Sequence, residues 1–431
     1  MFASTQLGKV AERARQEPAG RFHALAHLID KDALHRAFVR LRADAAVGVD
    51  GVTKEMYGRD LEVKIRDLHQ RLKTGRYRHQ PVRRTYIPKA NGQTRPLGVS
   101  SLEDKIVQGA IREVLEAVYE QDFLDCSYGF RPGRGAHDAI RALNRLAYTG
   151  QVQWVVEADI QSFFDSVDHA MLLDIIRQRV PDGSLLRLIG KGLKAGILDG
   201  EELSEPAMGT PQGSILSPLL ANIYLHQVLD VWFEREVKPR MRGKAYLVRY
   251  ADDFVMCFER RDDAERVLAV LGKRLERFGL KLHPDKTRLI CFERPVRAQQ
   301  QGKGPDSFDF LGFTVHWRRS LKGQWVPTFK TSGKRLRRAM DAITDFCRDR
   351  RHEPVQAQHA GLVRRLLGWY HYFGVSGNCR SLQRVALHVA RTWHKWLTRR
   401  SQRSRLTWER YQDLLKSFPL PPVRVYAPLW S

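Results

Sequence analysis

The spacing of apolar residues changes along the chain, and the changes predict an α+β fold rather than a doubly wound sheet. Residues 1–75 show helical spacing, with Leu25, Leu28, Ile29, Leu34 and Phe38 on one face. Short runs of β-branched and aromatic residues at 154–158 and 254–258 predict strands. One helix is predicted before the first of these strands, at 106–118, and another after the second, at 264–278.

Two antiparallel hairpins are predicted where strand-forming residues flank short turns. The first runs from Tyr86 to Leu97 and turns at Asn91-Gly92, a dipeptide typical of tight hairpins. Lys89 and Arg95 stand on its two arms, where they could close over a bound triphosphate. The second hairpin joins 247–250 to 254–258 and has Asp252 and Asp253 at or near its tip.

Beyond these hairpins the pattern predicts a glycine turn, a further strand and a helical domain. The Gly209 to Ser214 turn lets backbone approach a ligand closely, and Ser217-Pro218 predicts an N-cap and first helical residue. Residues 308–313 are predicted to form one strand. From about Thr331 the chain is helical and basic, and its apolar stripes predict a small bundle: Leu362, Val363, Leu366, Leu367, Tyr370, Leu382, Val385, Ala386, Val389, Trp393, Trp396 and Leu397.

The charge of the chain predicts a polyanionic partner. The 431 residues carry a net charge of +25, and residues 314–431 hold 24 Lys and Arg against 6 Asp and Glu. RNA or DNA, bound mainly through phosphates, is the natural partner of such a surface. No apolar run is long enough for a membrane span, and the N-terminus lacks the apolar core of a signal peptide. A soluble, cytoplasmic protein without a membrane partner is therefore expected.

The five cysteines argue against a disulfide framework and against a zinc finger. They are scattered and never form a C-x-x-C pair. We expect buried thiols in a reducing compartment, at Cys126, Cys257, Cys291, Cys347 and Cys379.

Three acidic residues indicate metal-assisted phosphoryl transfer. Asp252 and Asp253 would repel each other in a hairpin turn unless a cation neutralised them, and Asp159 ends the strand predicted at 154–158. Mg²⁺ commonly takes one or two carboxylates plus substrate phosphates. Three convergent carboxylates can hold two ions roughly 4 Å apart, a separation typical of two-metal sites.

The order of several sequence blocks resembles bacterial group II intron-encoded reverse transcriptases, the maturases, over nearly the whole chain. The blocks are Ile87-Pro88-Lys89 with Arg95-Pro96-Leu97, Gly129-Phe130-Arg131-Pro132, Asp159 with Phe163-Phe164-Asp165, Pro211-Gln212-Gly213, Tyr250-Ala251-Asp252-Asp253, Lys286-Thr287 and Phe310-Leu311-Gly312-Phe313. The resemblance implies a right-hand polymerase of fingers, palm and thumb. Its expected parts are an N-terminal extension (1–80), fingers and palm (81–313), a helical thumb or maturase domain (314–400) and a short basic tail (401–431).

The resemblance also implies catalytic roles. Asp159, Asp252 and Asp253 would bind two Mg²⁺, with the backbone carbonyl of Ile160 as a further ligand. Lys286 is expected to donate a proton to the leaving pyrophosphate. The implied activity is RNA-directed DNA synthesis from a primer 3′-hydroxyl.

Substrate contacts are implied in the same way. Lys89 and Arg95 would hold the triphosphate, and Gln212 would position the incoming nucleotide. Phe164 matches a steric gate that favours dNTPs over NTPs. Residues Phe310, Leu311, Gly312 and Phe313 match the primer grip. The implied partners are intron RNA, an RNA template, a DNA primer or target, and dNTPs.

The chain departs from the family pattern at one point, and two alternative functions are considered. Many relatives carry a C-terminal nuclease domain with paired Cys and His, which this chain does not show before Ser431, so second-strand cleavage in cis is not expected. Residues 401–431 are interpreted as a possible DNA-binding remnant. The alternatives are a maturase that binds RNA without polymerising, and a domesticated reverse transcriptase in defence or repair.

Overall fold

The computed structural model describes residues 5–88, 94–149, 152–200, 202–204, 208–210, 213–295, 306–401 and 406–430. Two predicted nucleotide-binding residues, Lys89 and Gln212, lie outside these ranges, as does the Asn91-Gly92 turn. None of the described helices is both long and apolar enough to cross a membrane.

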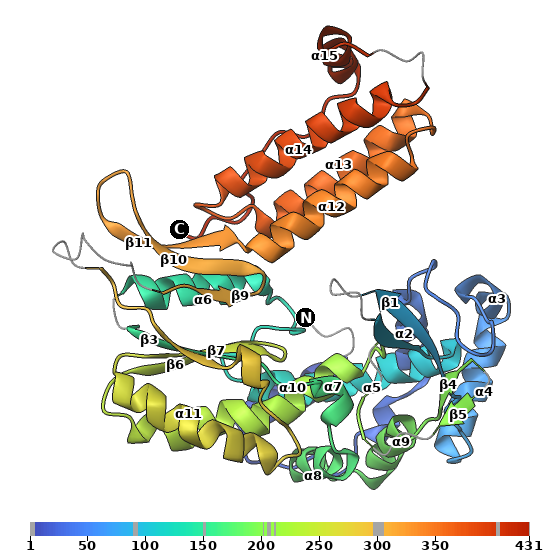
Figure 1. Cartoon of the computed structure of the whole chain (residues 1–431). Coiled ribbons are helices and arrows are strands. Elements are labelled where there is room, and N and C mark those ends of the chain that lie inside the picture. Colours follow the sequence, from blue (N-terminus) through green and yellow to red (C-terminus); the bar gives the residue numbers. More distant parts are fainter. Residues whose placement is uncertain are drawn as a thin grey trace.

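The N-terminal helices pack around one long buried helix, α5 (Leu102–Asp122). The helical spacing at 1–75 is confirmed as α1 (Thr5–Gln16), α2 (Lys31–Arg40), α3 (Lys54–Gly58) and α4 (Leu61–Lys73). Side-chain caps start two of these helices, because Asp30 accepts the N–H of Ala33 and Thr53 that of Met56. The group lies beside the first sheet (Figure 1, blue).

The first sheet has the strand order β2-β1-β4-β5. Its strands are β1 (Val82–Pro88), β2 (Thr94–Val99), β4 (Ile197–Asp199) and β5 (Glu202–Ser204). The pairing of β1 with β2 is antiparallel, with Ile87 opposite Arg95, so the first predicted hairpin is confirmed in its strands. Strand β4 pairs in parallel with β1.

The second sheet is entirely antiparallel, in the order β6-β7-β3-β8. Its strands are β3 (Trp154–Ala158), β6 (Ala245–Tyr250), β7 (Asp253–Phe258) and β8 (Arg288–Cys291). It is buried on both faces. Val156 and Met256 contribute to a core shared with the helices below the sheet, and Val155 and Val255 to a second core above it.

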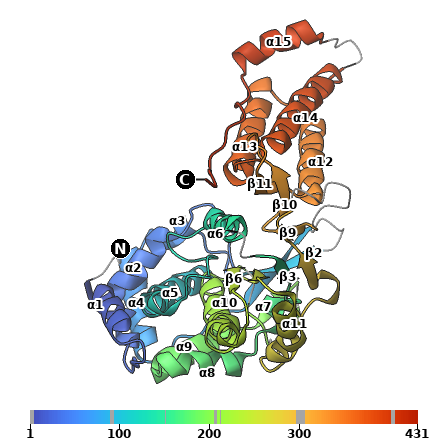
Figure 2. The same cartoon turned by 90° about the vertical axis from the view of Figure 1, so that its left-hand side faces the viewer.

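Helix α6 (Ala136–Tyr148) lies above this second sheet and α11 (Arg261–Glu276) below it (Figures 1 and 2). The other helices of this part of the chain are α7 (Phe163–Ser166), α8 (His169–Arg179), α9 (Gly183–Leu193) and α10 (Ser217–Leu225). Helix α10 runs on into the π-helical turns η2 (His226–Asp230) and η3 (Phe233–Val237) and the 3₁₀ turn η4 (Lys238–Arg240). The cap prediction for α10 was wrong by one residue, because Ser217 is its first helical residue and Leu216 its N-cap.

A third sheet, in the order β11-β10-β9, joins the second sheet to the C-terminal helices. It contains β9 (Phe308–Phe310), β10 (Phe313–Arg319) and β11 (Trp325–Thr331). The single strand predicted at 308–313 was wrong. Leu311 and Gly312 have φ angles of 51° and 80°, which turn the chain back so that Phe310 pairs with Phe313.

The predicted helical bundle stands above this sheet (Figure 2). Its helices are α12 (Gly333–Asp349), α13 (Val355–Phe373), α14 (Cys379–Thr398) and α15 (Trp408–Ser417). Asn378 ties the bundle to β11, since its amide donates to the hydroxyl of Thr331 at 2.7 Å and to the carbonyl of Phe373 at 2.8 Å.

The end of the chain returns to the body of the protein. Tyr426 donates its N–H to the carbonyl of Gly374, and the carbonyl of Leu429 accepts from Asn144 of α6. Leu429 is buried in the upper core. The last segment of the predicted tail thus packs between the bundle and α6. Contacts of this region with DNA stay a prediction.

Candidate active site

The three predicted carboxylates lie at one edge of the second sheet. The pairing of β3 with β7 ends at Ala158 opposite Phe254. Asp159 directly follows Ala158 and Asp253 directly precedes Phe254, so both leave the sheet at the same edge. Asp252 lies in the two-residue turn that joins β6 to β7, where Tyr250 pairs with Asp253. Residues far apart in the sequence are thus neighbours in space.

Their electrostatics show that the carboxylates repel one another. The pKa of Asp253 is raised to about 6, first by burial and then by the charges of Asp252 and Asp159. Burial and the charge of Asp159 also raise the pKa of Asp252. The Asp253 side chain keeps an open path to solvent even though protein surrounds it closely. A cation bound at this edge would lower both pKa values, because it would favour the ionised carboxylates.

Lys286 supplies one positive charge at this edge. Its ammonium lies 2.5 Å from a carboxylate oxygen of Asp159. It sits in a short turn, η5 (Pro284–Lys286), held by the N–H of His283 on the carbonyl of Asp159 at 2.8 Å. Ile160 lies beside this contact, with its side chain buried.

The donor set at this edge suits Mg²⁺ rather than an ion that needs a complete cage of side chains. Within the described ranges, no group of three or more His, Cys, Asp or Glu side chains is placed so that it could hold a metal ion by itself. Mg²⁺ does not need one, because it usually keeps waters and binds through one or two carboxylates plus substrate phosphates. Repelling carboxylates at an edge open to solvent fit an ion that the substrate completes.

The turn that carries Asp252 rests on the Gly129-Phe130-Arg131-Pro132 block. A Cβ atom on Gly129 would lie 2.4 Å from the backbone nitrogen of Ala251, so only glycine fits there. The carbonyl of Gly129 accepts from the Asn222 amide at 2.7 Å. Arg131 is buried and bonds to Glu120, which makes it a structural residue of this block.

On the nucleotide side, Arg95 is exposed on β2, and its charge lowers the pKa of Asp252. Phe164 is half-buried on α7, and its carbonyl accepts the N–H of Thr210 at 2.7 Å. Gly209, at φ +92°, lets the 208–210 segment lie against it. A cavity of about 350 Å³ opens here between the first sheet and this segment, and is lined by Arg84, Pro96, Leu97, Gly98, Asp165, Met208 and Thr210 among others.

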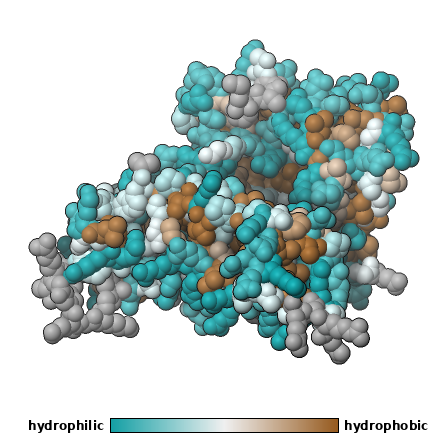
Figure 3. All heavy atoms as spheres, turned by 90° about the horizontal axis from the view of Figure 1, so that it is seen from above, coloured by the Kyte–Doolittle hydropathy of each residue, from teal (hydrophilic) through white to brown (hydrophobic). Residues whose placement is uncertain are grey.

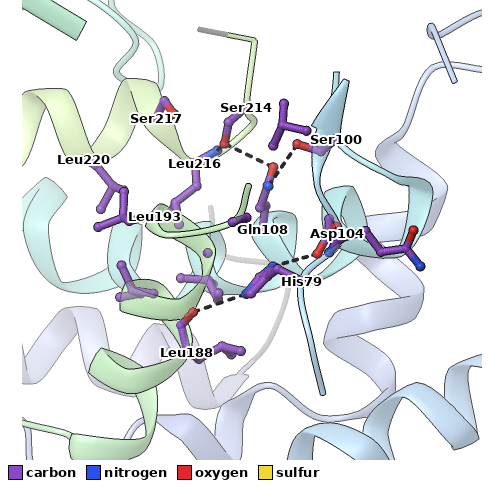
Figure 4. Close-up of a pocket in the computed structure, with 16 residues that line it drawn as sticks. His79, Ser100, Asp104, Gln108, Leu188, Leu193, Ser214, Leu216, Ser217 and Leu220 are labelled. Carbon is purple, nitrogen blue, oxygen red and sulfur yellow. Dashed lines mark hydrogen bonds and ion pairs between the residues drawn. The ribbon is translucent and has the colours of Figure 1, made fainter. Parts of the chain in front are cut away.

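A smaller cavity of about 30 Å³ lies between α5, α9, the start of α10 and the residues that precede β1 (Figure 4). Gln108 of α5 reaches across its edge, accepting from the Ser214 hydroxyl at 3.1 Å and donating to the Ser100 hydroxyl at 3.2 Å. His79 bonds Asp104 at 2.6 Å on the other side. These contacts join the segment after Gly213 and the residues next to the first sheet to α5.

The predicted primer grip, Phe310 to Phe313, forms the turn between β9 and β10 and contacts the helical bundle. The Tyr372 hydroxyl donates to the carbonyl of Leu311 at 3.0 Å, and the N–H of Ser332 donates to that of Gly312 at 3.0 Å. A groove of about 490 Å³ starts at this turn, lined by Leu311, Arg335, Arg338, Arg365, Trp369 and Tyr372 among others. The charge of Arg335, which lines the groove, partly offsets the rise in the pKa of Asp253.

Two features of the site were missed by the sequence reasoning. The first is the arginine pair of the groove, Arg335 and Arg338, which helical spacing marks only as exposed. The second is Arg249, a charge in the otherwise apolar stretch of β6. A lone charge at a core-facing strand position was a signal for a buried ion pair.

Comparisons with known proteins agree with this geometry. A family model described as "Reverse transcriptase (RNA-dependent DNA polymerase)" matches residues 87–315. The chain is 34% identical over 358 residues to protein YkfC of Escherichia coli, covering 75% of this chain and 91% of that protein. It is 31% identical over 378 residues to the group II intron-encoded protein LtrA of Lactococcus lactis, covering 74% of this chain and 60% of LtrA. An uncharacterized 91 kDa protein in the cob intron of Schizosaccharomyces pombe is 39% identical over 323 residues, covering 74% of this chain and 37% of that protein.

Proposed function

Since this chain belongs to the family of group II intron reverse transcriptases and maturases, we propose that it is an active RNA-directed DNA polymerase. It extends a primer 3′-hydroxyl with dNTPs on an RNA template. The observation that carries the proposal is the convergence of Asp159 with Asp252 and Asp253 at one edge of the second sheet.

In this proposal Asp159, Asp252 and Asp253 hold two Mg²⁺ ions. When bound, the ions lower the pKa of the primer hydroxyl and neutralise charge that develops on the phosphates. The three side chains keep this chemistry at the sheet edge. Burial and, after it, the neighbouring carboxylates raise the pKa of Asp253, and a bound cation would offset both effects.

Basic residues around the edge then bind and orient the substrates. Arg95 and Lys89 hold the triphosphate from the first hairpin, and Gln212 positions the nucleotide. Phe164 packs against Phe163, with 5.3 Å between their ring centroids, and its ring excludes the 2′-hydroxyl of an incoming NTP. Lys286 gives a proton to pyrophosphate after an incoming nucleotide has displaced it from Asp159.

The primer lies in the groove that starts at the turn formed by Leu311 and Gly312. Phe310 and Phe313 are buried below that turn and keep it rigid. Arg335 and Arg338 line the groove and meet the primer phosphates.

We further propose that the helical bundle binds intron RNA and assists splicing and mobility. Two observations favour this second function. The bundle carries much of the positive charge, and Arg364, Arg365 and Arg391 are exposed on it. Seen from above, the surface is mostly hydrophilic, with apolar residues gathered in a few patches (Figure 3).

Primer extension on poly(rA) with oligo(dT), dTTP and Mg²⁺ tests the polymerase. We expect the wild type to extend the primer, Asp252→Asn to be inactive with unchanged RNA affinity, and Asp341→Asn, on the outer side of α12, to match the wild type. Wild-type rates from Asp252→Asn would refute the carboxylate assignment.

The same assay separates the alternative functions. RNA binding without any extension by the wild type would favour a maturase with a vestigial polymerase site. Extension without an intron RNA structure in the DNA that flanks the coding region would favour a domesticated reverse transcriptase.

A further inference from the structure

Arg249 lies fully buried directly beneath the acidic turn, and each of its three guanidinium nitrogens has a partner. Nε and Nη2 donate to the two carboxylate oxygens of Asp230 at 2.7 and 2.6 Å. Nη2 also donates to the Ser127 hydroxyl at 2.8 Å. Nη1 donates to the Asn222 side-chain oxygen and to the backbone carbonyl of Ala251, both at 3.0 Å.

The partner Asp230 is equally buried and comes from the π-helical turn η2, which extends α10. A buried ion pair is weak evidence for stability, because desolvation of two charges offsets much of their attraction. Single π-helical turns inside α-helices often occur at functional sites. The pair therefore needs a reason other than stability of the fold.

Its bond to Ala251 supplies that reason. Ala251 has a φ angle of +56°, in the left-handed region that non-glycine residues adopt only with strain. It directly precedes Asp252, so its conformation sets the direction in which that carboxylate points. Gly129 closes the other side of Ala251. The guanidinium thus holds the carbonyl of Ala251, and Gly129 lies against its nitrogen.

We propose that Arg249, held by Asp230, is a positioning residue that fixes the Ala251–Asp252 turn for cation binding. It touches neither substrate nor ion, and acts through the Ala251 carbonyl. The inference rests on the proposed function, since it concerns the same acidic edge, but its test reads cation binding as well as activity.

The experiment separates the positioning role from the stability of the ion pair. Arg249→Met alone strands a buried carboxylate, so it is expected to melt at a lower temperature. The double variant Arg249→Met with Asp230→Leu removes both charges and is expected to regain a folded state. It still lacks the bond to the Ala251 carbonyl.

Calorimetric titration with MnCl₂ is the primary readout, on proteins whose folding is checked by circular dichroism. Losing an outer partner of a metal ligand typically weakens metal affinity or activity about 10- to 100-fold, and we expect this for the double variant. Its half-saturating Mg²⁺ in primer extension should rise with it. Arg249→Lys keeps the positive charge but lacks the planar guanidinium. It is the replacement variant if the double variant does not fold, and it should also bind Mn²⁺ more weakly than the wild type.

A second buried pair in the same chain provides the matched control. Arg179, at the end of α8, makes a two-bond contact with Asp122, at the end of α5, at 2.9 Å for both bonds. Arg179→Met with Asp122→Leu should bind Mn²⁺ as the wild type does.

The possible outcomes distinguish the inference from the function beneath it. A folded Arg249→Met, Asp230→Leu protein with wild-type Mn²⁺ affinity would overturn the inference, even if the wild type polymerises. Weakened Mn²⁺ binding in that variant together with no polymerisation by the wild type would support the positioning role and remove the proposed function.

Discussion

Replacing Asp253 with asparagine is expected to stabilise the metal-free protein while abolishing polymerisation. The pKa of Asp253 rises from 3.8 to about 6 on folding, mainly through burial and then through the charges of Asp252 and Asp159. A carboxyl whose folded pKa exceeds its unfolded value destabilises the protein once it ionises. The penalty is absent below a pH of about 4, grows between the two pKa values, and is fully present above a pH of about 6.

The magnitude follows from that shift and from the exposure of the side chain. Full conversion of the shift gives ~3 kcal/mol as an upper bound, at about 1.36 kcal/mol for each pKa unit. Because Asp253 keeps contact with solvent, screening reduces this to about 1 kcal/mol. For a chain of this size we expect a rise in melting temperature of about 2 °C.

Thermal unfolding in EDTA, at a pH of about 8, measures the effect. The control Asp341→Asn removes a charge from the outer side of α12 and should leave the melting temperature unchanged. Mg²⁺ should raise the melting temperature of the wild type and close the gap to Asp253→Asn, because the ion replaces the repulsion with attraction. A melting temperature for Asp253→Asn at or below that of the wild type in EDTA would refute the repulsion among the three carboxylates.

Three further predictions test the surroundings of the site. Gly129→Ala should lose most primer extension, because its Cβ would lie 2.4 Å from the Ala251 nitrogen; Gly183→Ala, with no atom within 4 Å of the new Cβ, should match the wild type. His79 holds the pKa of Asp104 below its usual value, against the effect of burial. The stability that Asp104 contributes is therefore present above its unfolded pKa and is lost as the pH falls through its lowered folded pKa. Urea unfolding of Asp104→Asn should show less of this loss of stability in acid. Neutralising Arg364 and Arg391 should weaken RNA binding. The slope of log affinity against log salt concentration should become shallower by about 1 for each phosphate contact that is lost. An unchanged slope would exclude the bundle as an RNA surface.

The strands and their charged ends could be predicted from sequence because local patterns determine them. The runs at 154–158 and 254–258 are mostly apolar on both faces, as expected for strands buried on both sides. An acidic pair between two such runs could lie only at a hairpin end. Asp168, which directly precedes α8, caps that helix by accepting the N–H of Met171.

Features that depend on φ angles or on distant partners could not be predicted. The aromatic run from Phe308 to Phe313 looks like one strand, since nothing in the letters shows that Leu311 adopts a left-handed conformation. Arg249 carries a clear signal of burial, but its partner Asp230 lies in a helix 19 positions earlier and no pattern joins the two. Gly129 is one glycine among 32, and only the coordinates show that it touches Ala251.

The burial of the second sheet on both faces explains why the helical bundle and the acidic edge are physically connected. Val155 and Val255 pack into the core that also contains Phe313, Leu366 and Tyr370 of the third sheet and the bundle. Val155 lies on β3, which leads directly to Asp159. Val255 lies on β7, which begins at Asp253. Interiors this closely packed transmit displacement rather than absorb it. A movement of the bundle on its bound nucleic acid would therefore reach the carboxylates through the strands themselves, in addition to the direct approach of Arg335.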